Sequence, residues 1–156
     1  MSAEWRKYIE FHPFNFYEGW AQKILVSRRY GKGENCIEYP PLDREAITYE
    51  SEKHVHLVII GMSRMGVAIG VEAAHLLHFP NFCRNPKYKS VITFIDEAAD
   101  KEMDFFRGRY RHYFEIASTI YYDMSGDKEL KQILPPTRFK GKDAKFLDIE
   151  FEFIKG

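Results

Sequence analysis

The chain has 156 residues, of which 45% are hydrophobic, 16% aromatic and 29% charged, and this composition is typical of one globular domain. Its 23 basic and 23 acidic side chains cancel, so no excess of positive charge favours nucleic acid or an anionic membrane as a partner. The longest apolar stretch, Val55 to Ile60, is far shorter than the roughly 20 residues of a membrane-spanning helix. Charged side chains among the N-terminal aromatic residues argue against a secretory signal, and the two cysteines, which form no Cys-x-x-Cys pair, favour a reduced, cytoplasmic setting.

The N-terminal third reads as a helix followed by a connector. Apolar residues recur at helical spacing between residues 15 and 30, and Asn15 stands where a helix cap is expected. This pattern predicts an amphipathic helix that Gly31 and Gly33 end. The polar, proline-containing stretch that continues to Glu52 predicts an extended connector. We therefore assign residues 1–53 to an N-terminal helix and connector.

The middle of the chain predicts a strand, a helix and a second strand. His54–Ile60 is a short apolar run, β-branched towards its end, as expected for a strand buried on both faces of a parallel sheet. A glycine-containing turn follows, and Val67–Phe79 then has helical character until Pro80. The run Val91–Ile95 reads as a second buried strand. Together these elements form a βαβ unit.

The C-terminal part predicts further elements of the same kind. Residues 98–109 are predicted to form a helix, 116–122 a strand, 128–134 a short helix before two prolines, and 146–154 a strand with alternating character. A doubly wound sheet normally continues into another helix after such a strand, so we expect a longer protein. The predicted fold class of residues 54–156 is α/β, with a three-layer, Rossmann-like parallel sheet that this chain need not contain in full.

The turn after the first of these strands, Gly61-Met-Ser-Arg-Met-Gly66, approaches the dinucleotide-binding fingerprint Gly-x-Gly-x-x-Gly. Gly61 permits a sharp turn out of the strand, and Gly66 and Gly70 let the helix lie close to the sheet. The free amides and partial positive charge of the helix N-terminus suit a pyrophosphate. A Walker A loop is excluded because Val-Ala, and not Lys-Ser or Lys-Thr, follows the second glycine.

An acidic residue at the end of the second strand completes the candidate site. Asp96 is placed to accept hydrogen bonds from the hydroxyls of an adenosine ribose, and an acid there favours NAD over NADP. Two features depart from the fingerprint: Ser63 replaces the middle glycine, and Asp96 lies farther from Gly61 than the usual roughly 20 residues. The Ser63 side chain occupies space that glycine leaves open, although its hydroxyl is also a donor. The candidate cofactor-binding residues are Gly61, Met62, Ser63, Arg64, Met65, Gly66, Asp96 and Glu97.

Other kinds of site find little support. Glu72, His75 and His78 share one predicted helix, but no second Glu-x-x-His or thiol pair accompanies them, so we predict no metal site. Arginines and tyrosines alternate over residues 107–113, and with a balanced net charge this favours a salt-bridged surface over nucleic-acid contact. No Ser-Lys-Tyr or His-Asp constellation with recognisable spacing is present, so we predict no catalytic residues and no enzyme activity.

Several segments resemble one family. His54–Gly66, with the sequence HVHLVIIGMSRMG, is similar to the strand and turn of the TrkA N-terminal domains, also called regulator-of-potassium-conductance domains. The helix Val67–Phe79 and the strand VITFIDEAAD are similar to the next elements of a subgroup of larger proteins in that family. Phe14–Glu18 and the following Ile24-Leu25 resemble the connector helix of that subgroup. The resemblance covers about residues 14 to 107.

The resemblance implies a Rossmann-fold nucleotide sensor of the type attached to bacterial potassium channels and transporters. It implies a cytoplasmic domain that binds NAD, NADH or a related adenine nucleotide such as ATP or ADP. Such a domain passes ligand occupancy to a membrane-embedded, ion-conducting part that lies outside this chain. By the same resemblance, the turn from Gly61 to Gly66 matches the phosphate-binding turn and Asp96 matches the ribose-binding acid.

Two other functions stay open from the residues alone. The chain is also compatible with a fragment of an NAD-dependent oxidoreductase, or with a Rossmann-like scaffold that binds no ligand. The many large aromatic side chains near the N-terminus need a cover, which the domain core or a second copy of the chain would provide, so we also expect a homo-oligomer.

Overall fold

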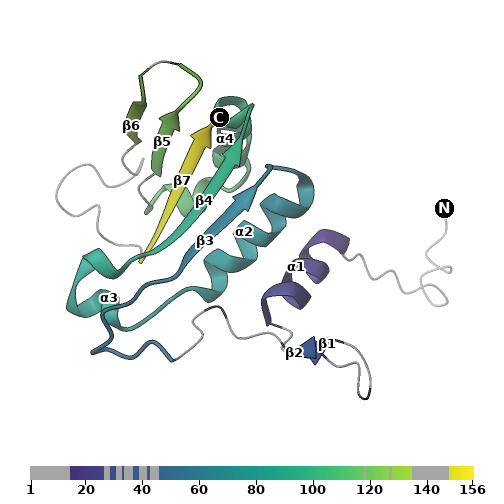
Figure 1. Ribbon diagram of the computed structural model, residues 1–156, viewed down its shortest axis with the longest axis vertical. Coiled ribbons are helices and arrows are strands. Elements are labelled where there is room, and N and C mark those ends of the chain that lie inside the picture. The colour runs from purple at the N-terminus through teal and green to yellow at the C-terminus, as the bar shows by residue number, and fades with distance from the viewer. Residues whose placement is uncertain are drawn as a thin grey trace, which may run out of the picture.

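A five-stranded sheet forms the centre of the protein (Figure 1). The computed structural model describes residues 15–26, 29–30, 33, 37–38, 42, 46–117, 119–126, 128–134 and 148–156. The strand order is β3 (His56–Ile60), β4 (Ser90–Asp96), β7 (Ile149–Lys155), β5 (Thr119–Asp123) and β6 (Leu130–Leu134). The first four strands in this order are parallel, and β6 pairs antiparallel to β5. β3 and β6 are therefore the two edges of the sheet.

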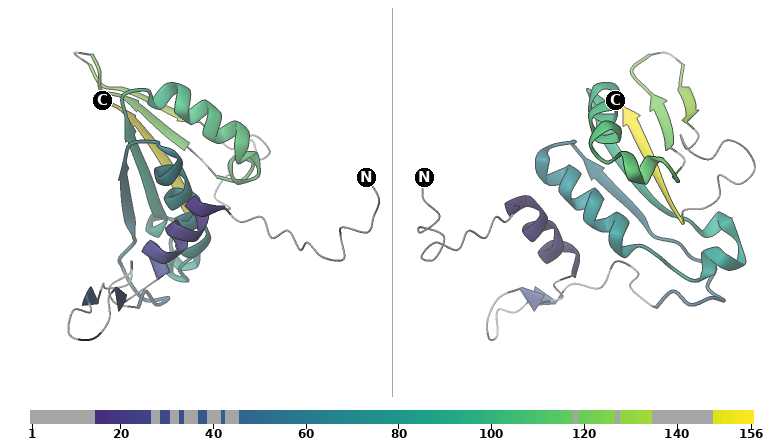
Figure 2. Two further views of the ribbon diagram at one scale, coloured as in Figure 1. Left: turned by 90° about the vertical axis from the view of Figure 1, so that its right-hand side faces the viewer. Right: turned by 180° about the vertical axis from the view of Figure 1, so that it is seen from behind.

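The helices α2 (Arg64–Leu76) and α4 (Ala99–Arg109) lie on the same face of the sheet (Figure 2). Phe94 shows this directly, because its ring lies against Gly70 of α2 and 5.4 Å from the ring centroid of Phe106 in α4. α1 (Phe16–Val26) packs on α2 and adds to the same side. The shorter elements are α3 (Asn81–Arg84), a 3₁₀ turn at Pro86–Tyr88, α5 (Arg111–Phe114) and the two-stranded β1 (Arg29–Tyr30) and β2 (Ile37–Glu38).

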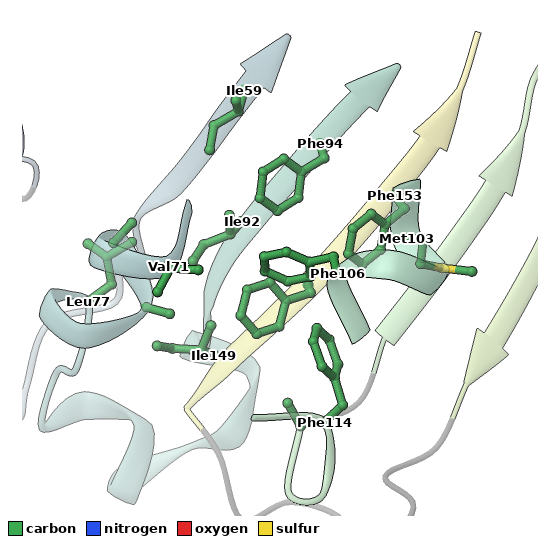
Figure 3. Packing of buried hydrophobic residues seen from close by; sticks show 14 of the residues in the cluster. Ile59, Val71, Leu77, Ile92, Phe94, Met103, Phe106, Phe114, Ile149 and Phe153 are labelled. Atoms are coloured by element: carbon green, nitrogen blue, oxygen red, sulfur yellow. The ribbon is translucent and has the colours of Figure 1, made fainter. Parts of the chain in front are cut away.

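The core is a layer of aromatic and aliphatic side chains between the sheet and these helices (Figure 3). Alternate residues of β4 and β7 point into it, because successive side chains in a strand face opposite sides of the sheet. Phe94 and Phe153 stack with ring centroids 5.4 Å apart. Phe106 of α4 meets both of these rings and also Phe114 and Phe151. One helical residue thus joins α4 to two neighbouring strands.

The opposite face of the sheet carries no helix among the described residues. β3 was expected to be buried on both faces, and this expectation is wrong, because Val58 and Ile60 are 49% and 85% exposed. The reason is that α2 covers only the side of β3 that bears Ile59. The second helical layer of a three-layer architecture has no counterpart in the part of the chain that the structure describes.

The structure confirms the α/β class with a mostly parallel, Rossmann-like sheet, and the predicted strand, helix and strand from β3 to β4. The cap predicted at Asn15 is also confirmed, because its side-chain oxygen accepts the amide of Tyr17 at 3.1 Å. The first helix, however, ends at Val26 and not near residue 30. About half of the predicted connector, and all of the aromatic residues before Asn15, lie outside the described residues.

One element was predicted with the wrong type. Residues 128–134 were expected to form a short helix, but Leu130–Leu134 is the strand β6. Its residues pair along the whole length of β5, from Leu130 opposite Asp123 to Leu134 opposite Thr119. Pairing with a neighbouring strand therefore outweighs the helix propensity of Glu, Leu, Lys and Gln in this segment.

Candidate functional site

The glycine turn begins directly after β3, at the carboxyl end of the parallel strands. Gly61 has φ +88°, a left-handed backbone conformation that L side chains rarely adopt, so the turn predicted at this residue is confirmed. Its amide donates to the carbonyl of Ile95 at 2.8 Å. The turn is therefore attached to the neighbouring strand β4 from its first residue.

Ser63 is the N-cap of α2. Its backbone is extended, with φ −62° and ψ 167°, and its hydroxyl accepts the amide of Gly66 at 3.2 Å. The sequence interpretation treated Ser63 as a replacement for a glycine and as a hydroxyl donor, and it missed this role as an acceptor. The signal was present, because serine directly before a helical segment is among the preferred N-caps.

Two glycines bring α2 close to the sheet, as predicted. A Cβ added to Gly66 would clash with the carbonyl oxygen of Gly61, which is backbone and is held by the turn. A Cβ added to Gly70 would clash with the ring of Phe94. Close packing of the helix at both places therefore needs residues without a side chain.

Asp96 connects the glycine turn to the turn after β4. One of its carboxylate oxygens accepts the amide of Met62 at 2.7 Å, and the other accepts the amide of Ala98 at 2.8 Å. The structure thus brings Asp96 and the glycine turn together, although they are far apart in the sequence. A carboxylate has about four lone-pair sites, so this one keeps acceptor capacity for a ligand hydroxyl. Glu97 is exposed beside it.

The first turn of α2 presents donors to an anion. Among the described residues, no hydrogen bond is made by the backbone amides of Arg64 and Met65, and the turn contains no acidic side chain. The Arg64 side chain is exposed at the same helix end. Unpaired amides, the helix dipole and a nearby guanidinium together favour binding of a phosphate or carboxylate.

A pocket of about 370 Å³ opens beside the turn, between α2 and α4. The glycine turn contributes Met62 and Arg64 to its lining. From α4 and the residue after it come Phe105, Arg109 and Tyr110, which the sequence interpretation did not include in the site. Alternation of basic and aromatic residues was the available signal, but only the fold brings Arg109 to the same pocket as Arg64.

A charged cluster lies along the carboxyl ends of β7 and β5. Asp96, Lys155 and Asp123 are in register across the three strands β4, β7 and β5. Lys155 Nζ donates to the carboxylate of Asp100 at 3.4 Å. The backbone amide of Lys101 holds the pKa of Asp100 below its ordinary value, and Lys155 acts in the same direction. The bond to Asp100 raises the pKa of Lys155.

His75, in the last turn of α2, and His78, just after the end of this helix, each contact polar side chains. Tyr113 and His75 are hydrogen bonded, with His75 also 3.8 Å from the carboxylate of Glu72. His78 lies 2.7 Å from the carboxylate of Asp148. Among the described residues, no group of three His, Cys, Asp or Glu side chains is arranged to hold a metal ion.

The fold and the turn define an α/β protein with a Rossmann-like, mostly parallel sheet. Comparison with known proteins finds no matching family model, no matching curated protein and no matching solved structure. Within the described ranges, none of the helices has the length and apolarity required to cross a bilayer.

Proposed function

We propose that the protein is a regulatory domain that binds NAD, NADH or a related adenine nucleotide at the glycine turn, and that it is not an enzyme. The observation that carries this proposal is the attachment of the glycine turn to the end of β4, where the Met62 amide donates to the Asp96 carboxylate and the Gly61 amide donates to the Ile95 carbonyl. In dinucleotide-binding sheets a helix N-terminus that binds phosphate lies beside an acid that binds ribose, and the nearness of the first turn of α2 to Asp96 supports the same roles here.

The residues present fit such a ligand. Its phosphates would meet the amides of Arg64 and Met65 and the Arg64 guanidinium, while the ribose hydroxyls would donate to Asp96. The lining of the adjacent pocket adds Arg109 and also the acidic residues Glu18 and Glu102, so the phosphates would be held by the helix end and not by the pocket.

Strand order supports the same function. The neighbouring parallel strands β3 and β4, with the glycine turn after β3 and Asp96 at the end of β4, match the first two strands of a mononucleotide-binding half, whereas the next strand in the sheet, β7, is the last in the chain. Regulation is inferred from the resemblance to TrkA N-terminal domains. In this proposal the domain is cytoplasmic and transmits nucleotide occupancy to an ion-conducting membrane part outside this chain.

One observation favours a ligand-free scaffold as the second candidate. The Ser63 hydroxyl already accepts the Gly66 amide, and both oxygens of Asp96 already accept backbone amides. Every polar side-chain group of the turn except Arg64 therefore has a structural role without any ligand.

Isothermal titration of the purified chain with NAD, NADH, ATP and ADP tests the proposal. We expect saturable binding of at least one nucleotide, weakened about tenfold or more by Arg64→Gln, which corresponds to about 1.4 kcal/mol. Arg111→Gln is the matched control, since Arg111 is 80% exposed on α5, outside the pocket lining.

Two results would contradict the proposal. If the folded chain binds none of these nucleotides, the function as a ligand-free scaffold is favoured. Consumption of NADH at a steady rate in the presence of a carbonyl substrate mixture would favour the oxidoreductase fragment.

A further inference from the structure

Three helices, α1, α2 and α4, line the pocket of about 370 Å³, and all three lie on one side of the sheet (Figure 2). This volume falls within the range of small-molecule sites. Among the described residues, Met62 and Arg64 belong both to the lining and to the candidate cofactor-binding set, whereas Asp96, the acid assigned to the ribose, does not line the pocket. Most of the pocket is therefore left free by the proposed nucleotide.

The inner wall of the pocket is apolar. Met62, Val71 and Phe106 line it and are almost completely buried. Phe105 also lines the pocket but is 74% exposed, and its ring contacts no other ring among the described residues. A free aromatic ring beside an apolar wall gives a ligand a place to bury an aromatic group.

Charged side chains of both signs complete the lining. Glu102 and Arg109 come from α4, Glu18 comes from α1 and Arg64 from α2. Glu18 accepts the side-chain amide of Asn15 at 2.8 Å. None of the four charged side chains forms an ion pair with any residue that the structure describes. Two positive and two negative groups thus line one pocket without neutralising one another.

This balance of charge selects for a ligand that carries both signs. A ligand with one charge would be attracted by two of these groups and repelled by the other two. A zwitterion offers an ammonium group to a carboxylate and a carboxylate to a guanidinium, and both contacts are charge-assisted hydrogen bonds. The lining therefore discriminates against analogues that lack either charge.

The order of residues along α4 indicates the length of the ligand. Glu102, Phe105 and Arg109 share one face of this helix, because residues three, four and seven apart lie on the same side. Seven residues correspond to about 10 Å along the helix axis. An extended dipeptide spans about 7 Å, and the side chains of Glu102 and Arg109 can cover the remainder. The ring of Tyr110, 5.7 Å from the guanidinium carbon of Arg109, supports this arginine at the pocket.

We propose that this pocket binds a small peptide with free termini, about two residues long, that carries an aromatic side chain. Its ammonium group lies at Glu102, its carboxylate at Arg109 and its ring against Phe105 and the apolar wall. These three residues of α4 take no part in the proposed nucleotide contacts. The inference therefore goes beyond the proposed function and does not depend on it.

A ¹H–¹⁵N NMR titration of the full chain, without nucleotide, tests this proposal with the dipeptide alanyl-phenylalanine as the probe. For a ligand of this size we expect a dissociation constant in the micromolar to millimolar range. N-acetyl-alanyl-phenylalanine and alanyl-phenylalanine amide each lack one charge, and we expect both to bind about tenfold or more weakly. Phenylalanine alone carries both charges at a shorter distance, and we expect it to bind more weakly than the dipeptide.

Two variants of α4 test the assigned partners. Glu102→Gln and Arg109→Gln each remove one charge from the lining, and we expect each to weaken binding of the dipeptide about tenfold or more. The matched controls are Asp104→Asn and Arg111→Gln, which remove the same charges at exposed positions outside the lining. We expect both controls to bind the dipeptide as the wild type does.

Four results would overturn the proposal. The first is the absence of saturable shift changes up to about 10 mM dipeptide. The second is equal binding of a blocked dipeptide and the zwitterion, and the third is equal or tighter binding of phenylalanine. The fourth is an equal loss of affinity in the lining and control variants. None of these outcomes depends on nucleotide binding, so failure here is distinguishable from failure of the proposed function.

Discussion

Ser63 holds the first turn of α2 through its side chain. Its hydroxyl satisfies the Gly66 amide, one of the four amides that a helix leaves unpaired at its start. We expect Ser63→Ala to lower the free energy of unfolding by about 1 kcal/mol, and Ser63→Gly by only a few tenths, because glycine is tolerated at an N-cap. Urea denaturation followed by circular dichroism measures both values.

The same pair of variants bears on the departure from the glycine fingerprint. If the Ser63 side chain limits access of the pyrophosphate, Ser63→Gly binds nucleotide more tightly than the wild type, despite its lower stability. Equal affinity in titration calorimetry would show that the serine at this position does not obstruct the ligand.

Asp123 makes a local contribution that depends on pH. Its carboxylate accepts the hydroxyl and the amide of Ser125, and these bonds hold its pKa below the ordinary value. Since the folded pKa lies below the unfolded value of about 3.9, this stabilisation is present above that pH and is lost as the pH falls through the folded pKa.

We therefore expect Asp123→Asn to destabilise the protein at pH 7 and to have less effect at pH 3, where the wild type also loses this contribution. Urea denaturation at both pH values measures the difference. Asp104→Asn, at an exposed position of α4, serves as the control. An effect of Asp123→Asn that is equal at the two pH values would contradict the assignment.

At the scale of elements, the contact between α2 and the sheet depends on Gly70. A methyl group there meets the buried ring of Phe94, so we expect Gly70→Ala to lower the free energy of unfolding by about 1–3 kcal/mol. Gly108 in α4 has open space around its Cα, and Gly108→Ala should raise stability by up to about 1 kcal/mol through helix propensity alone. Thermal or urea denaturation of both variants compares the two helices.

A stabilising Gly70→Ala would mean that Phe94 moves aside without cost. That outcome would contradict the close packing inferred for α2.

Local patterns predicted most elements because hydrophobic periodicity and turn residues act over short distances. The βαβ unit from β3 to β4 was readable from an apolar run, a glycine turn and a helix stopped before Pro80. β6 was not readable, because its helix-favouring residues become a strand only through pairing with β5. The capping role of Ser63 could be predicted, because serine stands directly before the helix, but the same residue also occupies a glycine position of the fingerprint.

At the scale of the whole molecule, the order of the strands in the sheet could not be predicted from local sequence patterns. β7 lies between β4 and β5, although β5 and β6 precede it in the chain. This insertion brings Lys155 into register with Asp96 and Asp123. Pairing between segments that are distant in the sequence decides such arrangements, and no local pattern in β7 indicates which strands it pairs with.

The core of the whole molecule depends on Phe106. Its ring meets those of Phe94, Phe114 and two strand residues, and it is 3% exposed. We expect Phe106→Ala to lower the free energy of unfolding by about 3–5 kcal/mol, a large share of the 5–15 kcal/mol of a typical domain. The neighbouring Phe105 is 74% exposed, so Phe105→Ala should change stability by less than about 0.5 kcal/mol.

Urea denaturation measures both phenylalanine variants under the same conditions. Similar losses for the two would contradict the assignment of Phe106 to the core and of Phe105 to the surface.

The two hydrogen bonds that Asp96 accepts can also be followed by spectroscopy. The amides of Met62 and Ala98 donate to the two oxygens of one carboxylate. In a ¹H–¹⁵N spectrum the signals of these two amides should therefore move together when the carboxylate changes its contacts. Any ligand that engages the carboxylate should displace both signals at once, so a single pair of peaks reports on two turns.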